Sequence, residues 1–316
     1  MLSISTAFFN LRKINSWRKL LNETHELGFF ALELNVETPA DFLPEIERSV
    51  AKGEIKISSL HNYCPRLENL PAGRTIFSGY LPTSDDENER QLALKYTRLT
   101  IEWAGRLGAS AVVLHAGEVP TDPSGREFFR YIEQFGHEGK LYDQYKNALL
   151  EDRLKKAGVY MDRLTKFLDE ILPDASRAGI IIGIENRFFI HEIPNISEVQ
   201  LLLDRFSGRP LAYWHDTGHA EVFVRQKWTE KHEDYLKPFL GRTAGVHLHD
   251  LRALNDHFAP GSGDFDFSSM KQYLAGVPLK VVEAHSKSTP DEVKRSIEYL
   301  KKAGLLSASE LETPKS

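Results

Sequence analysis

Short apolar runs alternate with longer amphipathic stretches along this chain, and no other feature constrains the fold as strongly. Each run holds about five to seven residues rich in Val, Ile, Leu, Ala or aromatic side chains, which is typical of strands buried on both faces of a parallel sheet. Eight such runs occur, at residues 2–8, 30–35, 56–61, 111–115, 180–185, 211–216, 244–249 and 280–284. Strand–helix alternation implies parallel strands with right-handed crossovers, and eight units close naturally into a (β/α)8 TIM barrel.

The stretches between the runs carry helical signals, and most of them end at a glycine, a common helix stop. The predicted helices cover residues 16–27, 87–107, 159–178, 197–206, 232–240, 267–274 and 289–303. An open doubly wound sheet is the alternative fold, but neither GxGxxG nor GxxxxGK[ST] follows the first run. We expect a single barrel domain over residues 1–306 and a polar tail over 307–316.

Two connections are too long for simple loops, one over residues 62–86 and the other over 117–158. Both follow predicted strand ends, the third and the fourth, on the side of the barrel where active sites are built. Long insertions there are candidate lids or substrate walls, and the second connection is rich in aromatic residues. The alternative is an added helical hairpin that only packs on the barrel.

Charge and cysteine content narrow the class of protein. The net charge of −5 and the pI near 6.2 provide no basic footprint for a nucleic-acid backbone, so a nucleic-acid partner is disfavoured. The single cysteine, Cys64, cannot form an intramolecular disulfide, which fits a reducing compartment. No uncharged apolar run approaches the roughly 20 residues that a membrane helix needs. We therefore expect a cytoplasmic protein with no membrane association.

Potential metal ligands stand at the ends of six consecutive predicted strands, and an acid, Glu33, lies near the end of the second. The strand-end ligands are His61, His115, Glu185, Asp216, His247 and Glu283. In a barrel these ends lie on one ring, so the side chains converge. Converging carboxylates repel each other unless a cation lies between them, and mixed oxygen and nitrogen ligands suit Mn, Zn, Fe or Co better than Ca. The alternative is a metal-free cluster of paired histidines and acids.

Two further histidines are left out of the predicted ligand set. His215 and His249 lie next to Asp216 and two residues from His247, respectively. Side chains alternate along a strand, so we expect His215 to point away from Asp216 and His249 to point away from His247.

Four motifs together resemble the xylose isomerase-like barrel superfamily. They are Gly-Ile-Glu-Asn-Arg at 183–187, His-Asp-Thr-Gly-His-Ala at 215–220, Val-His-Leu-His-Asp at 246–250 and His-Phe-Ala-Pro-Gly-Ser-Gly-Asp at 257–264. This superfamily includes sugar and sugar-phosphate isomerases and epimerases, inositol-catabolic enzymes and type IV apurinic endonucleases. Each motif is modestly specific, but their order and spacing match over nearly the whole chain.

The resemblance implies a metal site. In the epimerase-like branch it implies one divalent ion, with Mn, Zn, Co, Fe or Mg as candidates, held by Glu185, Asp216, His247 and Glu283. His219 would then contact the substrate or a second metal.

The endonuclease branch implies three zinc ions. A second or third metal would there use His61, His115, His219 and His257. The aspartate of that branch's Asp-x-His pair falls on Asn255, with Asp256 one residue later, and this departure weakens a complete trinuclear site.

The leading hypothesis is a metal-dependent isomerase or epimerase acting on a sugar, sugar phosphate or related polyol through an enediolate. Glu185 and Glu283 would transfer the proton or serve only as metal ligands. Arg187 would grip a phosphate or carboxylate, or form a structural salt bridge. Further substrate contacts are predicted for four histidines: His61, His115, His219 and His257.

Two alternatives remain open: a zinc-dependent phosphodiesterase acting on abasic DNA, and a barrel that binds a ligand or metal without catalysis. The predicted partner is a small carbohydrate, and a homo-oligomer is allowed.

Overall fold

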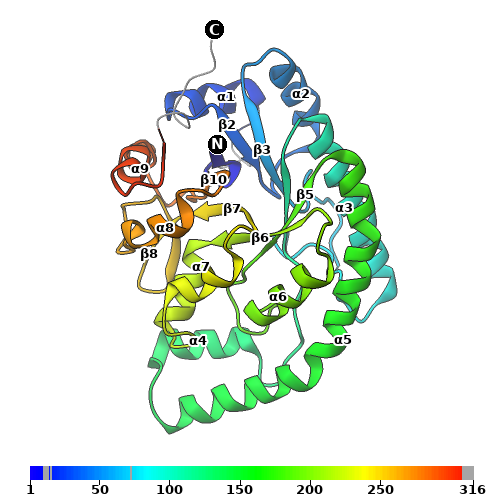
Figure 1. Cartoon of the computed structure of the whole chain (residues 1–316), viewed down its shortest axis with the longest axis vertical. Helices are drawn as coiled ribbons and strands as arrows, with labels where there is room; N and C mark the ends of the chain where they lie inside the picture. The colour runs from blue at the N-terminus through cyan, green and yellow to red at the C-terminus, as the bar shows by residue number, and fades with distance from the viewer. Residues whose placement is uncertain (10–13, 15, 72, 308–316) are drawn as a thin grey trace.

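The computed structural model describes residues 1–9, 14, 16–71 and 73–307, and its centre is a closed barrel of eight parallel strands (Figure 1). Around the barrel the strand order is β1-β10-β7-β6-β5-β4-β3-β2. The strands are β1 Leu2–Ser5, β2 Ala31–Leu34, β3 Lys56–His61, β4 Ala111–Leu114, β5 Ile181–Glu185, β6 Leu211–Asp216, β7 Thr243–Leu248 and β10 Leu279–Val282. Each overlaps one of the eight apolar runs, so the predicted fold class is confirmed. The predicted tail lies almost wholly outside the described residues.

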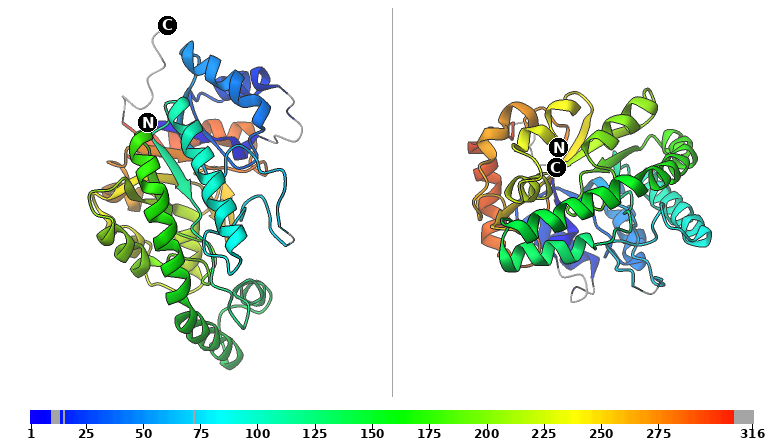
Figure 2. Two further views of the ribbon diagram at one scale, coloured as in Figure 1. Left: turned by 90° about the vertical axis from the view of Figure 1, so that its right-hand side faces the viewer. Right: turned by 90° about the horizontal axis from the view of Figure 1, so that it is seen from below.

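Helices surround the barrel (Figures 1 and 2). They are α1 Trp17–Glu26, α2 Leu43–Ala51, α3 Glu87–Arg106, α4 Gly125–Phe135, α5 Lys140–Ala178, α6 Ile196–Arg205, α7 Thr217–Arg225, α8 Lys271–Leu274 and α9 Pro290–Lys302. A short antiparallel ribbon of β8 Asp250–Arg252 and β9 Asn255–Phe258 follows β7. Capping boxes begin α6 at Asn195 and α9 at Thr289, and satisfy backbone N–H groups that the first helical turn leaves free.

The helix predicted over residues 232–240 is wrong. This segment forms only two 3-10 turns, η3 His232–Tyr235 and η4 Lys237–Phe239, because Pro238 has no N–H to continue a helix. The helix after β6 is instead α7, which begins directly after the strand. Asp216 caps it by accepting the His219 backbone N–H at 2.7 Å. The helix α2 was also not predicted.

The two long connections differ in structure. Among the described residues of 62–86 there is no helix or strand, whereas 117–158 contains α4 and the first half of α5. These two helices pack through Phe128, Ile132, Tyr142 and Leu149, and form a hairpin at the lower end of the molecule in Figure 1. The second connection is therefore a helical hairpin, and whether either connection is an insertion or a lid stays a prediction.

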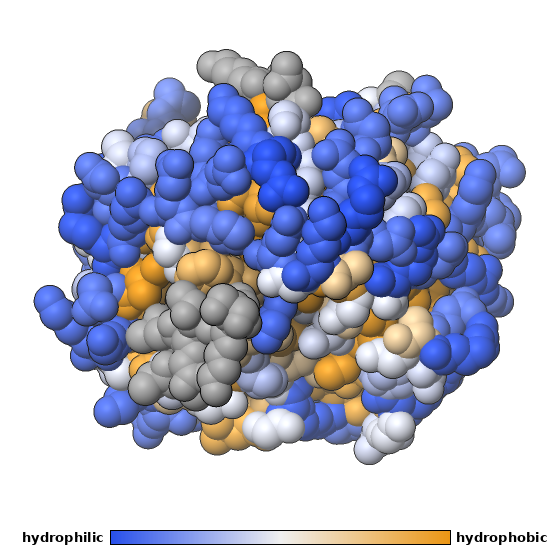
Figure 3. Space-filling model, turned by 90° about the horizontal axis from the view of Figure 1, so that it is seen from above, coloured by the Kyte–Doolittle hydropathy of each residue, from blue (hydrophilic) through white to orange (hydrophobic). Residues whose placement is uncertain are grey.

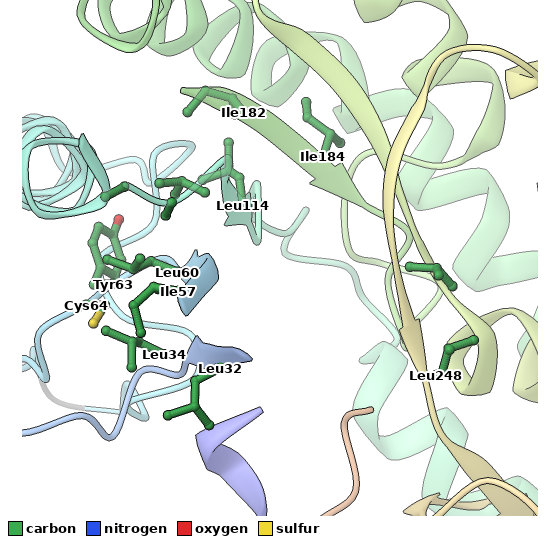
Figure 4. Close-up of a cluster of buried hydrophobic side chains, with 14 of the residues drawn as sticks. Leu32, Leu34, Ile57, Leu60, Tyr63, Cys64, Leu114, Ile182, Ile184 and Leu248 are labelled. Atoms are coloured by element: carbon green, nitrogen blue, oxygen red, sulfur yellow. The ribbon is translucent and has the colours of Figure 1, made fainter. Parts of the chain in front are cut away.

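Apolar side chains fill both the barrel and the layer between barrel and helices. Figure 4 shows part of this core, with Leu32, Ile57 and Ile182 among the buried side chains. Inside the barrel, the fully buried Trp214 occupies space left by two glycines of the neighbouring strands. A Cβ atom at Gly183 or Gly245 would come within 2.8 or 2.2 Å of its ring. The Trp214 ring lies edge-on to His247 at 5.2 Å, so this packing supports the base of the site.

The surface matches the polar composition. The face seen in Figure 3 is mostly hydrophilic, with hydrophobic residues between the hydrophilic ones. Within the described part of the chain, no helix is long and apolar enough to cross a membrane.

Candidate metal centre and active site

Four side chains from four neighbouring strands meet at the carboxyl end of the barrel. Glu185 ends β5, Asp216 ends β6, His247 lies in β7 and Glu283 follows β10. Each offers one ligand atom, and these four atoms all lie within 4.8 Å of one another. All four residues are buried. The sequence predicted that these residues would converge, and their positions confirm the convergence.

The imidazole of His247 is oriented by a fifth buried residue. Its Nδ1 faces the cluster, 2.6 Å from Glu185 Oε1, 3.1 Å from Glu283 Oε2 and 3.7 Å from Asp216 Oδ2. Its Nε2 lies 3.1 Å from Glu33 Oε2, which also accepts a hydrogen bond from the Ser59 hydroxyl at 2.8 Å. This carboxylate–imidazole pair leaves Nδ1 as the nitrogen that a metal would bind. The sequence placed Glu33 at the strand ends but gave it no role.

The cluster holds more negative charge than its own side chains balance. Burial raises the pKa of Glu283 well above its ordinary value, and the charges of Glu33 and Glu185 add to this. Burial alone would lower the pKa of His247, but Glu283 and Glu33 raise it well above the usual range. A proton on His247 thus occupies the place where the donors converge, and a divalent cation would displace it.

Glu185 connects this cluster to a second group of donors. Its Oε2 lies 2.8 Å from His115 Nε2 and accepts a hydrogen bond from Arg187 at 2.7 Å. His61, His115 and Glu185 form another set of ligand atoms within 4.8 Å of one another. Burial and the adjacent His115 lower the pKa of His61 well below its ordinary value, so its imidazole is neutral and able to bind a metal.

Arg187 is already paired on both sides. Besides Glu185, it donates to Glu192 Oε1 at 3.0 Å, and its guanidinium is about 10% exposed. The structural salt bridge considered in the sequence analysis is therefore present. A role in binding substrate stays a prediction.

A third group of donors surrounds Asp216 and contains His219, His249 and His257. The prediction that His249 lies outside the ligand cluster is wrong. Alternation places residues two apart on the same side of a strand, so it gave no reason to separate His249 from His247, and the Nε2 of His249 lies 2.9 Å from both oxygens of Asp216. The Nδ1 of His249 accepts the His257 backbone N–H at 2.9 Å, so Nε2 carries the proton and donates to Asp216. His249 thus orients Asp216.

His215 points away from the cluster, as predicted. Its ring nitrogens lie 3.1 Å from the Tyr213 hydroxyl and 3.0 Å from His232 Nε2. Tyr213 also donates to the side chain of Asn186, which accepts the Asp216 backbone N–H at 2.6 Å. This buried network fixes the end of β6, and with it the position of Asp216.

Asn255, the residue at which the sequence departs from a trinuclear zinc site, is also engaged elsewhere in the structure. Its side-chain oxygen accepts a hydrogen bond from Lys287 Nζ at 2.5 Å, and Asn255 is exposed. The adjacent Asp256 instead pairs with His257, 2.9 Å from its Nδ1. His257 stacks between His249 and His285, with ring centroids 4.1 and 3.9 Å away. Sequence analysis gave His285 no role, although it lies two residues beyond Glu283.

A cavity of about 210 Å³, here called the inner cavity, opens onto the cluster. Its lining brings together all the histidines predicted to contact substrate. The lining residues are Ala7, Asn35, Val36, His61, Phe77, His115, Glu185, Arg187, His219, His257, Glu283 and His285. The arrangement can bind a cation in its floor and a small polar molecule above it.

The fold and this site define a class of protein, namely a (β/α)8 barrel whose mouth carries side chains that could bind a metal. A family model described as "Xylose isomerase-like TIM barrel" matches residues 21–303, and the chain belongs to this family. No curated protein matches the chain in a sequence comparison.

Solved structures share the fold across nearly their whole length. A D-tagatose 3-epimerase-like protein is 19% identical, with 96% of each chain covered and a TM-score of 0.65. A 3-keto-D-glucoside 4-epimerase from E. coli is 13% identical, with 95% of this chain and 98% of that chain covered and a TM-score of 0.68. A protein from Thermus thermophilus, soaked with ZnCl2, is 18% identical, with 99% of each chain covered and a TM-score of 0.59. At these identities the likeness establishes the fold.

Proposed function

We propose that this protein is a divalent-metal-dependent isomerase or epimerase of a sugar, sugar phosphate or related polyol that acts through an enediolate. One observation carries the proposal: Glu185, Asp216, His247 and Glu283 present their ligand atoms to a common point beneath an open cavity. The names of similar structures support the reaction class, since they include a D-tagatose 3-epimerase-like protein and a 3-keto-D-glucoside 4-epimerase.

The donor set fits a divalent ion of the Mn, Fe, Co or Zn type, with Mg as a further candidate. Three carboxylates and one imidazole match the oxygen and nitrogen ligands of these metals. Excess negative charge in a buried site is costly, and the raised pKa of Glu283 expresses that cost. When bound, the ion would polarise a substrate carbonyl and stabilise the negative charge that develops on its oxygen.

Glu185 and Glu283 are the proposed proton carriers. Burial opposes ionisation of Glu185, but His247 and His115 lower its pKa well below the ordinary value, so it is a carboxylate able to accept a proton. Glu283, whose pKa is raised, is suited to return one. The two residues lie on different sides of His247, Glu185 at the end of β5 and Glu283 after β10, and would approach the reacting carbon from different directions.

The remaining residues would bind and orient the substrate. His61, His115, His219 and His257 line the inner cavity, where their ring nitrogens could contact hydroxyl groups. Arg187 and His115 both contact Glu185 Oε2, so they would hold that carboxylate in place while its other oxygen faces the cluster.

A second candidate function, zinc-dependent cleavage of abasic DNA, is favoured by one observation. The groups His61–His115–Glu185 and Asp216–His219–His249–His257 provide donors for a second and a third metal. Two observations oppose it: Asn255 is turned toward Lys287, and His249 uses both ring nitrogens in hydrogen bonds. We therefore retain it as the alternative, beside a barrel that binds without catalysis.

Proton exchange with solvent tests the proposed function. Metal-loaded protein is incubated in D2O with ketohexoses and their phosphates, and deuterium at the carbon next to the carbonyl is followed by NMR. We expect incorporation with the native protein and none above background with Glu185→Gln. Full exchange by a Glu185→Gln variant that still binds metal would refute the proposed role of Glu185.

A further inference from the structure

A second chamber adjoins the inner cavity on the side of β4 and β5. This outer chamber has a volume of about 310 Å³ and shares three lining residues with the inner cavity: Phe77, His115 and Arg187. Its remaining walls come from the connection after β3, from the segment between β4 and α4, from α4 itself and from the segment after β5. They are formed by Thr75, Ser78, Leu81, Gly117, Glu118, Arg126, Phe188, Phe189 and Glu192.

The size of the inner cavity alone is small for a substrate site. Its volume of about 210 Å³ is below the range of about 300–1,000 Å³ that is usual for small-molecule pockets. A ligand that extended past Phe77 into the outer chamber would use a space within that range.

Aromatic rings form much of the outer wall. Phe188 and Phe189 lie edge to face at 4.9 Å, and Phe129 of α4 packs against Phe188 at 4.9 Å. Phe77, at the border of the two spaces, is 49% exposed. An exposed phenyl ring between two adjoining cavities is an apolar surface that a ligand would cover.

The charged groups of the outer chamber are balanced within the protein. Glu118 contacts Arg74 at 3.2 Å and Arg126 at 3.4 Å. Glu192 accepts hydrogen bonds from Arg187 and, at 2.8 Å, from the Phe189 backbone N–H. Since both lining arginines are paired with carboxylates, the chamber suits a neutral ligand better than a phosphate.

We infer that the outer chamber binds a second sugar ring, so that the substrate is a glycoside or disaccharide whose reacting sugar occupies the inner cavity. A sugar ring has hydroxyl groups at its edge for the polar walls and apolar C–H faces for the phenyl rings. The inference rests on the proposed function and narrows its substrate class to neutral sugars carrying a second ring.

Matched sugars test the inference. Calorimetry on the Mn2+-loaded protein compares D-fructose with maltulose and isomaltulose, which carry a glucosyl group on O4 and O6 of the same ketose. We expect one of the disaccharides to bind about tenfold tighter than D-fructose, the effect of burying roughly 50 Å² of apolar surface. Phe77→Ala should weaken binding of the disaccharide more than binding of D-fructose, and so remove this preference. The control Phe135→Ala changes an exposed phenylalanine of α4 that lines neither space, and should retain the preference.

Failure of the inference and failure of the proposed function give different results. Equal binding of all three sugars, or a preference that survives Phe77→Ala, would overturn the inference while deuterium exchange into D-fructose upheld the proposed function. Absence of exchange into every sugar would count against the proposed function, and tight binding of a disaccharide without exchange would leave a carbohydrate-binding barrel.

Discussion

Two of the regions that hold buried carboxylates, the barrel mouth and the helical layer, differ in the surroundings of those carboxylates. At the barrel mouth, Glu283 lies among other acids, and its pKa is raised by burial and by those neighbours. In the helical layer, Glu198 accepts two hydrogen bonds from Arg153 of α5, at 2.8 and 2.9 Å. In the helical layer the protein itself provides the balancing cation, Arg153. At the barrel mouth it provides too little positive charge to balance the carboxylates. This difference separates an ion pair that holds two helices together from a site built to receive a cation.

The largest expected effect comes from Glu283→Gln, which keeps the shape of the side chain and removes its charge. Because Glu283 is both a proposed ligand and a proposed proton carrier, turnover should fall by about 10²- to 10⁴-fold. Deuterium exchange rates measure this effect. Glu198→Gln is the matched control, because Glu198 is a buried carboxylate that lines neither cavity, and the turnover of this variant should equal that of the native protein at temperatures where both are folded. Equal losses of turnover in both variants would contradict the difference between the barrel mouth and the helical layer.

The free energy of unfolding should respond in the opposite order, with the larger loss in Glu198→Gln and not in Glu283→Gln. Glu198→Gln leaves Arg153 buried without its partner charge, which costs about 3–5 kcal/mol of unfolding free energy. Chemical denaturation measures the loss. The exposed pair of Glu170 with Arg98 provides the reference, since Glu170→Gln should change stability by less than about 1 kcal/mol. A loss from Glu198→Gln no greater than that reference would contradict the account of this ion pair.

Acid titration tests a third carboxylate, Glu118, whose negative charge is balanced by neighbouring side chains of the protein. The neighbouring His191 imidazole, 3.7 Å away, together with Arg126 and Arg74, lowers the pKa of Glu118 to about 2. Because its folded-state pKa lies below its ordinary value, ionised Glu118 stabilises the fold above that ordinary value. This contribution, up to about 3 kcal/mol, is lost as the pH falls toward 2.

The measurement is the difference in unfolding free energy between the native protein and Glu118→Gln at several pH values. The difference should shrink as the pH falls from 5 toward 2, in about the range of the two pKa values. A difference that stays constant with pH would show that Glu118 acts through its shape and not through its charge.

The smallest expected effect concerns Glu33, which contacts the cluster only through His247. Glu33→Gln should weaken metal binding by about 10- to 100-fold, because the carboxylate fixes the ring orientation and the basicity of His247. Titration with Mn2+ or Zn2+ followed by calorimetry gives the affinity. Unchanged affinity would mean that the barrel backbone alone orients His247.

The sequence predicted the barrel and the converging ligands because both follow from local patterns. Strand-end residues of a closed parallel barrel lie on one ring. The convergence of four of them could therefore be predicted without knowing the paths of the loops: Glu185, Asp216, His247 and Glu283. The helix α7 was missed although Asp216 is a favourable N-cap residue, because the apolar pattern over 232–240 indicated the helix after β6 in spite of Pro238.

The remaining site residues depend on directions that residue order does not encode. His249 was excluded although alternation places residues two apart on the same side of a strand, and its hydrogen bond to Asp216 is formed just beyond the end of β7 at Leu248. The pairing of Glu192 with Arg187 depends on the path of an irregular segment. Patterns with a fixed period predict strands and their ends, whereas side chains on irregular segments are placed by packing.

Elemental analysis and anomalous diffraction of the purified protein, after incubation with Mn2+ or Zn2+, test the central claim most directly. The account predicts one tightly bound ion per chain, with Glu185, Asp216, His247 and Glu283 as its protein ligands. An ion bound elsewhere, or no ion between these four side chains at saturating metal, would contradict it.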